Sequence, residues 1–265
     1  MRKIKNYTRP KSIEEAYEIY KKGRSIFLAG GTFIGSKRNI KLENLIDLQE
    51  TKLNYIQEKD DSIHIGAMTT ISDIVDAKTV ASSFSGILNK AARRLASPAI
   101  RNISTIGGNI MSGVPWSDIT PVLLSIDAEL LLFDGETHRV KIDNFFGDSK
   151  FSNMLLLEII IKRWGRGSYR RFSRTEVDIP QVVCALTQHN KVRAAAGAIW
   201  KFPQRIRGLE TVLEKGKVSD NEVRDIVDKE VKAFSDLRGE AEFKKEIASA
   251  LFIDIVEELG TIRHG

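Results

Sequence analysis

Two pairs of adjacent glycines are the residues best suited to contact a ligand through their backbone. One pair lies in FLAGGTFIG, residues 27 to 35, and the other in STIGGNI, residues 104 to 110. Glycine lacks Cβ, so a charged group can come close to its N–H and a positive φ costs little. Successive N–H groups in such turns form a concave site for an anion. Each pair ends an apolar run and has a threonine beside it, Thr32 or Thr105, whose hydroxyl is a further donor.

Two such loops, if they converge, would hold a pyrophosphate from both sides. The alternative is that each pair forms only a tight turn. The chain has no G-x-G-x-x-G opening a helix and no G-x-x-x-x-G-K-[ST], so the Rossmann fingerprint and the P-loop are both absent. A dinucleotide would therefore have to bind through another fold.

The other reactive side chains form no recognisable catalytic set. His64, His138, His189 and His264 include no pair with the spacing of metal ligands, so we expect no metal site. Cys184, the only cysteine, lies in an apolar run and is expected to be a buried core thiol. A single cysteine excludes an internal disulfide and an iron–sulfur cluster held by this chain alone. An enzyme without acid, base, metal or nucleophile leaves the chemistry to a cofactor.

Length and composition describe an ordinary globular protein of one or two domains. The chain has 265 residues, 42% hydrophobic and 29% charged, with a net charge of +6. The basic residues are spread along the chain and form no basic-aromatic stripe, so we expect no nucleic-acid partner. No apolar stretch approaches the length of a membrane span, and the basic N-terminus lacks the apolar core of a signal peptide. We therefore expect a cytoplasmic protein.

Hydrophobic periodicity and turn residues predict an α+β fold rather than a doubly wound sheet. Ser12 and Glu15 form a capping-box pattern at the start of the first helix, and Asp134–Gly135 predicts a hairpin turn. The expected helices are 13–22, 71–77, 87–96, 115–126, 205–215 and 243–259; the expected strands are 25–29, 45–48, 63–65, 129–133 and 154–161, with two more within 181–200.

A change of composition after the long apolar run MLLLEIII, residues 154 to 161, predicts a domain boundary. The following segment, KRWGRGSYRRFSR, is basic, contains glycines and lacks periodicity. We therefore expect a first domain of residues 1–165, in two lobes of about 1–55 and 56–165, and a smaller α+β domain of residues 166–265.

Four segments of the chain resemble a known family. Residues 7–35 are similar to the start of the FAD-binding medium subunit of molybdenum hydroxylases, the xanthine and carbon-monoxide dehydrogenase family; their sequence is YTRPKSIEEAYEIYKKGRSIFLAGGTFIG. LASPAIRNISTIGGNIMSGVPWSDITPVLLSIDAELLL resembles the second signature of that family over its whole length. YRRFSRTEVDIPQVV and SDLRGEAEFKKEI resemble the opening and closing segments of its C-terminal domain. The resemblance implies a two-lobed FAD-binding domain of the PCMH type, which is vanillyl-alcohol-oxidase-like.

The resemblance also implies which residues bind FAD. The first pyrophosphate loop would consist of Phe27, Leu28, Ala29, Gly30, Gly31, Thr32, Phe33 and Ile34, and the second of Thr105, Ile106, Gly107, Gly108 and Asn109. A phenylalanine at position 33 replaces a residue that is commonly polar in the family, although its backbone could still serve a phosphate.

Three further residues match family positions near the cofactor, and each has a second interpretation. Asp118 would accept hydrogen bonds from FAD hydroxyls, or it would cap the helix that follows it. Leu156 would touch the flavin, or it would be a core residue only. Arg171 stands where the family often has a lysine near the isoalloxazine, and it could equally be a surface residue. We expect Arg174 and Asp178 to form an ion pair between domains, and Trp116 to be a packing residue rather than a contact of FAD.

In the family, electrons pass from two [2Fe-2S] clusters on a small chain through FAD to NAD+ or another acceptor, while a molybdopterin-binding large chain hydroxylates the substrate. The resemblance therefore implies an FAD-dependent oxidoreductase subunit, xanthine dehydrogenase-like, with both chains as partners. Two alternatives stay open: a non-catalytic scaffold or assembly module of such a complex, and a stand-alone flavin oxidoreductase.

Overall fold

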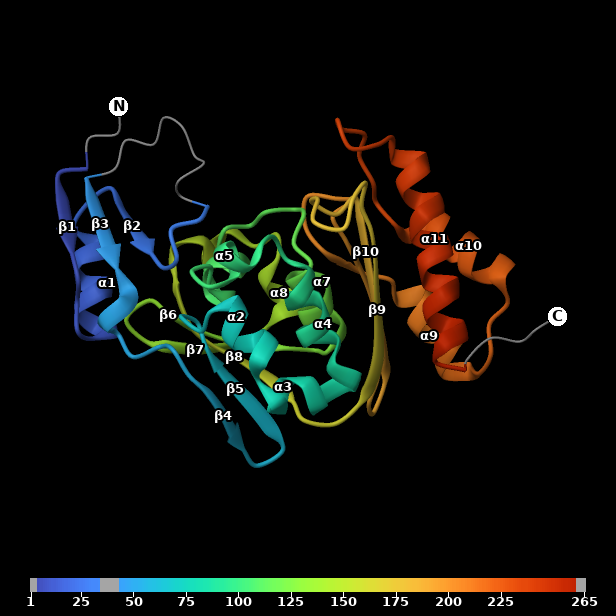
Figure 1. Ribbon diagram of the computed structural model, residues 1–265, viewed down its shortest axis with the longest axis horizontal. Helices are drawn as coiled ribbons and strands as arrows, with labels where there is room; N and C mark the ends of the chain where they lie inside the picture. The colour runs from blue at the N-terminus through green and yellow to red at the C-terminus, as the bar shows by residue number, and fades with distance from the viewer. Residues whose placement is uncertain (1–3, 34–42, 261–265) are drawn as a thin grey trace.

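The computed structural model describes residues 4–33 and 43–260, which form three β-sheets with helices packed around them (Figure 1). The strands are β1 (Asn6–Thr8), β2 (Ser25–Leu28), β3 (Asn44–Asp47), β4 (Ile56–Lys59), β5 (Ser62–Gly66), β6 (Glu129–Phe133), β7 (Thr137–Lys141), β8 (Leu155–Lys162), β9 (Arg166–Phe172), β10 (Val182–Gln188), β11 (Val192–Gly197) and β12 (Gln204–Arg205). The α-helices are α1 (Ile13–Lys21), α2 (Ile71–Asp76), α3 (Lys78–Ser82), α4 (Ile87–Arg94), α5 (Pro98–Arg101), α6 (Ile106–Met111), α7 (Ile119–Ser125), α8 (Ile142–Phe145), α9 (Arg207–Lys215), α10 (Asp220–Glu230) and α11 (Ala241–Glu258).

The first lobe is a small parallel sheet with the strand order β1-β3-β2, and α1 packs beside it. Helix α1 begins where the sequence predicts, because the hydroxyl of Ser12 accepts a hydrogen bond from the N–H of Glu15 at 3.1 Å. Ala16 and Tyr17 of this helix are buried against Ile46 and Leu48. The same cluster includes Phe133 of β6 and Leu155 of β8, so the first lobe packs its apolar residues against the second.

The second lobe is built on an antiparallel sheet with the strand order β4-β5-β8-β6-β7. Strand β8 lies at its centre and is buried over Leu155–Ile161, as the run MLLLEIII predicts. The predicted hairpin is also present, because β6 pairs with β7 across the turn that contains Gly135. Helices α2, α4, α6 and α7 contribute to the main core cluster with β5, β6 and β8, so the residues between β5 and β6 form a helical layer.

The third sheet, β12-β11-β10-β9, stands between two layers of helices (Figure 1). Val183, Ala185 and Ala195 on one face belong to the same core as α4 and α7, whereas Cys184 and Leu186 on the other face pack with the C-terminal helices. Alternation of side chains along each strand explains this division. The C-terminal sheet therefore shares a core with the second lobe.

The structure differs from three expectations about local structure. The basic segment after β8 contains strand β9, whose alternation is obscured by arginines and glycine. The sequence predicts one apolar face of the last helix, made of Phe243, Ile247, Leu251, Ile255 and Leu259. Only Ile255 of these is fully buried, and Ile247, Leu251 and Leu259 are partly buried, because steps of four drift by about 40° each. The buried face instead contains Ala248 and Phe252. The glycine pair after Thr105 lies in helix α6 and not in a tight turn.

Cys184 is buried, as expected, and burial raises the pKa of its thiol well above the ordinary value. None of the helices described is long and apolar enough to cross a membrane. Within residues 4–33 and 43–260, no group of three or more His, Cys, Asp or Glu side chains could hold a metal ion.

Candidate functional site

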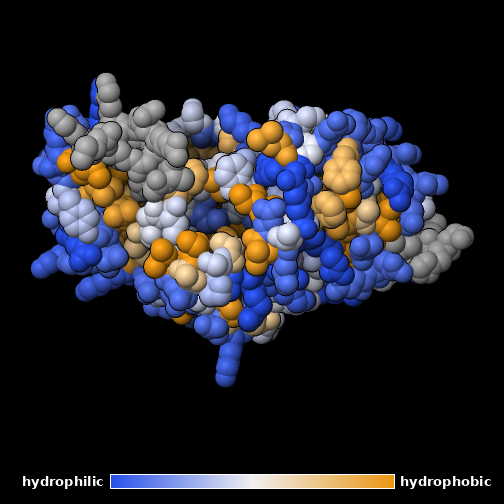
Figure 2. All heavy atoms as spheres, turned by 45° about the horizontal axis from the view of Figure 1, so that its top comes forward, coloured by the Kyte–Doolittle hydropathy of each residue, from blue (hydrophilic) through white to orange (hydrophobic). Residues whose placement is uncertain are grey.

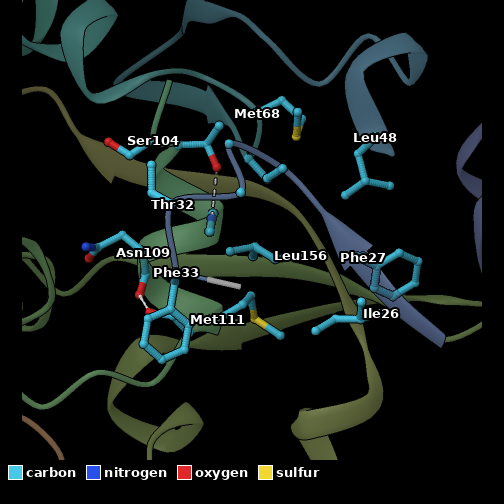
Figure 3. Close-up of a pocket in the computed structure, with 18 of the residues that line it drawn as sticks. Ile26, Phe27, Thr32, Phe33, Leu48, Met68, Ser104, Asn109, Met111 and Leu156 are labelled. Carbon is cyan, nitrogen blue, oxygen red and sulfur yellow. Dashed lines mark hydrogen bonds between the residues drawn. The ribbon is translucent and has the colours of Figure 1, made fainter. Parts of the chain in front are cut away.

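A cavity of about 560 Å³ opens between the first and second lobes, and most of the predicted ligand-binding residues line it (Figure 3). Its size is in the range of small-molecule and cofactor sites. The predicted residues in its lining are Phe27, Ala29, Gly30, Gly31, Thr32, Phe33, Thr105, Gly107, Gly108, Asn109 and Leu156. The two glycine pairs therefore lie in the lining of one cavity, and their contact with a ligand stays a prediction.

The remaining predicted residues lie elsewhere. Leu28, on β2, and Ile106, which is fully buried in the main core, are not in the lining. Ile34 lies outside the described residues. Leu156 lines the cavity and is also a buried core residue on β8, and its contact with a flavin stays a prediction.

The first glycine loop follows β2 and leaves a row of hydrogen-bond donors available. In the part of the chain that the structure describes, no hydrogen bond uses the N–H of Gly30, Gly31 or Thr32. Gly31 has a φ of +70°, a conformation that favours glycine. Thr32 is exposed and adds a hydroxyl. The loop can therefore donate to an anionic group in the cavity.

The second glycine loop is different, because its glycines lie in the first turn of α6. The N–H of Gly107 donates to the carbonyl of Ala67 at 2.9 Å, and the N–H of Gly108 donates to the Thr105 hydroxyl at 3.0 Å. A Cβ on Gly107 would lie 2.6 Å from that same Ala67 oxygen. The N–H groups of Gly107 and Gly108 are therefore already bonded within the protein. The expected anion-binding turn is wrong for these two glycines.

The two loops touch each other. A Cβ on Gly30 would lie only 1.7 Å from the carbonyl oxygen of Ile103, and one on Gly108 would lie 3.7 Å from the Cβ of Ala29. The expectation of two separate loops facing each other across a ligand is therefore replaced by two loops packed side by side. Gly30 is required for this close approach, irrespective of any ligand.

The rest of the cavity is largely apolar and offers flat surfaces to ring systems. Tyr20 and Phe27 stack at its edge with centroids 4.6 Å apart and planes 17° apart. Met68, Met111 and Leu155 also belong to the lining. Neither Tyr20 nor the methionines were predicted from the sequence. The helical phase that Tyr20 shares with the buried Tyr17 on α1 could have indicated Tyr20, whereas no pattern indicated the methionines.

Asp118 and Arg171 form a buried cluster that does not line the cavity. Asp118 is 3% exposed, accepts a hydrogen bond from the Tyr169 hydroxyl and lies 3.2 Å from Nε of Arg171. Burial raises the pKa of this carboxyl, although the charge of Arg171 and the bond from Tyr169 act in the opposite direction. Their contact with a cofactor stays a prediction.

The alternative interpretations of these two residues are wrong. Asp118 does not cap α7 with its side chain, because the Ser117 hydroxyl accepts from the N–H groups of Ile119 and Thr120. Arg171 is not a surface residue, because its side chain is 8% exposed and donates to the carbonyls of Glu176 and Arg94.

The expected pair of Arg174 and Asp178 is also absent from the ion pairs of the described residues. Arg174 instead donates to the carbonyl oxygen of Leu237 at 2.9 Å. This bond joins the segment after β9 to the segment before α11, so Arg174 makes its contact within residues 166–265.

Solved structures define the class of fold. The chain resembles a chain of carbon monoxide dehydrogenase from Hydrogenophaga pseudoflava with a TM-score of 0.89 and 24% identity, covering 97% of each chain. It also resembles a chain of quinoline 2-oxidoreductase from Pseudomonas putida 86, with a TM-score of 0.86, 18% identity and coverage of 98% and 99%. The α+β fold is therefore the one that these two chains share.

Sequence comparison then identifies the family. Residues 2–164 match the family described as the FAD binding domain in molybdopterin dehydrogenase. The Escherichia coli (strain K12) protein YgfM is 29% identical over 258 residues, 95% of each chain. The nicotinate dehydrogenase FAD-subunit of Eubacterium barkeri is 32% identical over 169 residues, 58% of this chain and 57% of that one. The chain belongs to this family as an FAD-binding oxidoreductase subunit of the molybdenum hydroxylases.

The residues in the cavity fit FAD. The unused N–H groups of Gly30, Gly31 and Thr32 can donate to a pyrophosphate, and the apolar lining suits flat rings. Gly107 and Gly108 of the second loop belong to the same lining. A row of donors beside an apolar cleft is the combination that a dinucleotide with two ring systems requires.

Proposed function

We propose that this chain transfers electrons within a molybdenum hydroxylase complex. It takes them from [2Fe-2S] clusters on a partner chain and delivers them, through FAD, to NAD+ or another acceptor. FAD when bound supplies the redox chemistry, and the chain itself supplies binding and orientation. The observation that carries this proposal is the row of unused backbone donors beside an apolar cavity, in a chain whose sequence shows no catalytic acid–base or nucleophile set.

The residues of this chain would act on the cofactor in three ways. The loop at Gly30, Gly31 and Thr32 would hold the pyrophosphate, and hydrogen bonds to a charged acceptor are stronger than those between neutral groups. The apolar walls around Phe27 and Leu156 would exclude water from the ring systems. Asp118 and Arg171, which do not line the cavity, would contribute through their charges, and a hydrogen bond from FAD to Asp118 stays part of the proposal.

Two partner chains follow from this function. Relatives are named as a carbon monoxide dehydrogenase medium chain and a nicotine 6-hydroxylase medium subunit, and a medium chain implies a larger and a smaller one. We propose that the larger binds molybdopterin and the substrate, and that the smaller holds the clusters. A xanthine dehydrogenase-like activity would then be a property of the complex. Within this chain, we keep the proposed boundary between residues 165 and 166, where β9 begins.

The test has two stages. The purified chain should bind FAD with a dissociation constant in the micromolar range or lower and show an oxidised-flavin absorption spectrum. Pull-down of the full chain from native extract should then recover iron and molybdenum with the flavin. A wild-type chain that binds no FAD would contradict the proposal, and recovery of both metals without flavin would favour the scaffold instead. NADH-dependent dye reduction by the chain alone would favour a stand-alone oxidoreductase.

A further inference from the structure

The C-terminal third of the chain contributes no residue to the cavity lining, yet it holds the segment at the edge of the cavity. All the described residues in the lining lie between Tyr20 and Leu156. Val114 and Trp116 belong to that lining, and the residues around them are tied to the third sheet. The N–H of Ala198 donates to the carbonyl of Pro115 at 3.0 Å.

Arg238 is the side chain of the C-terminal region that reaches Trp116. Its guanidinium carbon lies 5.4 Å from the centroid of the Trp116 ring, within the range of a cation–π contact. Its Nη1 donates to the carbonyl of Pro180 at 3.3 Å, and its Nε donates to the carboxylate of Asp236 at 3.0 Å. The guanidinium is therefore held in one place over the ring.

Asp236 is held in turn from helix α11. The ammonium of Lys244, whose side chain is fully buried, lies 2.8 Å from Oδ1 of Asp236. Burial of Asp236 acts to raise its pKa, but the bonds from Lys244 and Arg238 outweigh it and lower the pKa to about 2. The carboxylate is therefore charged at neutral pH, and the chain of contacts Lys244–Asp236–Arg238 runs from the C-terminal helix to the cavity edge.

Trp116 is only partly covered by the rest of the protein. Its residue is 38% exposed, although it lines the cavity and has a cation near its ring. Exposed hydrophobic residues interrupt the polar surface on the face that is turned forward in Figure 2. An indole in this position can stack on a flat ring that enters the cavity.

We propose that Arg238 is a positioning residue that holds Trp116 against the bound flavin nucleotide, so that the C-terminal region completes the FAD site through one ring. This inference rests on the proposed function, because it requires FAD in the cavity. It assigns Trp116 to the cofactor, against the expectation from sequence that it only packs.

The chain contains a matched control. Arg163 lies over the ring of Trp164 with its guanidinium carbon 4.8 Å from the centroid, and Trp164 is 56% exposed. This second pair is not part of the cavity lining. Substitutions there remove the same kind of contact without touching the proposed site.

The experiment is a double-mutant cycle on FAD affinity, measured by titration of the full chain. Trp116→Leu and Arg238→Gln are each expected to raise the FAD dissociation constant about fivefold, the size of one cation–π or stacking contact. Once Trp116→Leu is present, Arg238→Gln should have no further effect, because Arg238 acts through Trp116. Trp164→Leu and Arg163→Gln should leave FAD affinity unchanged.

The outcomes separate the possible failures. If the wild-type chain binds no FAD, the proposed function fails. If it binds FAD and Trp116→Leu binds equally well, only this inference fails, even where Arg238→Gln does not fold. Equal effects of Arg238→Gln with and without Trp116 would assign Arg238 a general structural role and also overturn the inference.

Discussion

The two glycine pairs have similar sequences, but they differ in whether their backbone N–H groups are free to bind a ligand. Gly30–Gly31 stands in an irregular loop with its N–H groups unused, whereas Gly107–Gly108 opens a helix whose N–H groups are already bonded to Ala67 and Thr105. The first loop can therefore bind a charged group, and the second shapes the space beside it. A short motif does not reveal whether its donors are free, because their acceptors are supplied by distant residues.

The same comparison separates two reasons for glycine. A positive φ is needed at Gly31, where a Cβ would meet only the Cδ1 of Leu28, at 3.3 Å. Close approach is needed at Gly30 and Gly107, where a Cβ would overlap backbone atoms of Ile103 and of Ala67 respectively. Three of the four glycines can thus be explained without a ligand, and the binding function depends on the backbone between them.

The largest effect is expected from Gly30→Ala. The new Cβ would overlap the Ile103 carbonyl, so the two loops would have to separate, and the free energy of unfolding should fall by about 3 kcal/mol. Gly31→Ala, in the same pair, is the control and should cost about 1 kcal/mol for its backbone conformation. Urea denaturation of the FAD-free chain measures both, and equal losses would show that the loops are not in contact.

Thr32→Val should affect binding rather than stability. Its hydroxyl is exposed and would donate to the pyrophosphate, and such a bond to a charged acceptor is worth about 1.5 kcal/mol or more. The FAD dissociation constant should therefore rise about tenfold while the unfolding free energy changes by less than about 0.5 kcal/mol. Unchanged FAD affinity would remove Thr32 from the site.

Thr105→Val should have the opposite profile and a smaller effect. The Thr105 hydroxyl caps α6 by accepting from Gly108, so its loss should reduce the unfolding free energy by about 1 kcal/mol. FAD affinity should change by less than about threefold, since this hydroxyl is already bonded within the protein. A large loss of affinity at normal stability would mean that both loops donate to the ligand, and the distinction between them would be wrong.

Local patterns predicted most of the elements around the site. The Ser12 cap, the hairpin at Gly135 and the buried strand β8 depend on residues close together in sequence, and all three are present. Helix α10 was missed, although Ser219 and Glu222 form a capping box at its start. Strand β9 was also missed, because its alternating pattern is hidden by Arg170 and Arg171, whose charges are neutralised by residues elsewhere in the chain.

The sequence alone determined the α+β fold class and placed both glycine pairs beside one cavity, because glycine pairs, caps and apolar runs act over short distances along the chain, and its resemblance to a known family indicated FAD. Only the tertiary structure decided which donors are free, that Asp118 and Arg171 form a buried pair, and that Arg238 reaches Trp116. The physical reason is that each of these outcomes depends on a partner far away in sequence. A hydrogen bond or a charge is available to a ligand only when no such partner has taken it.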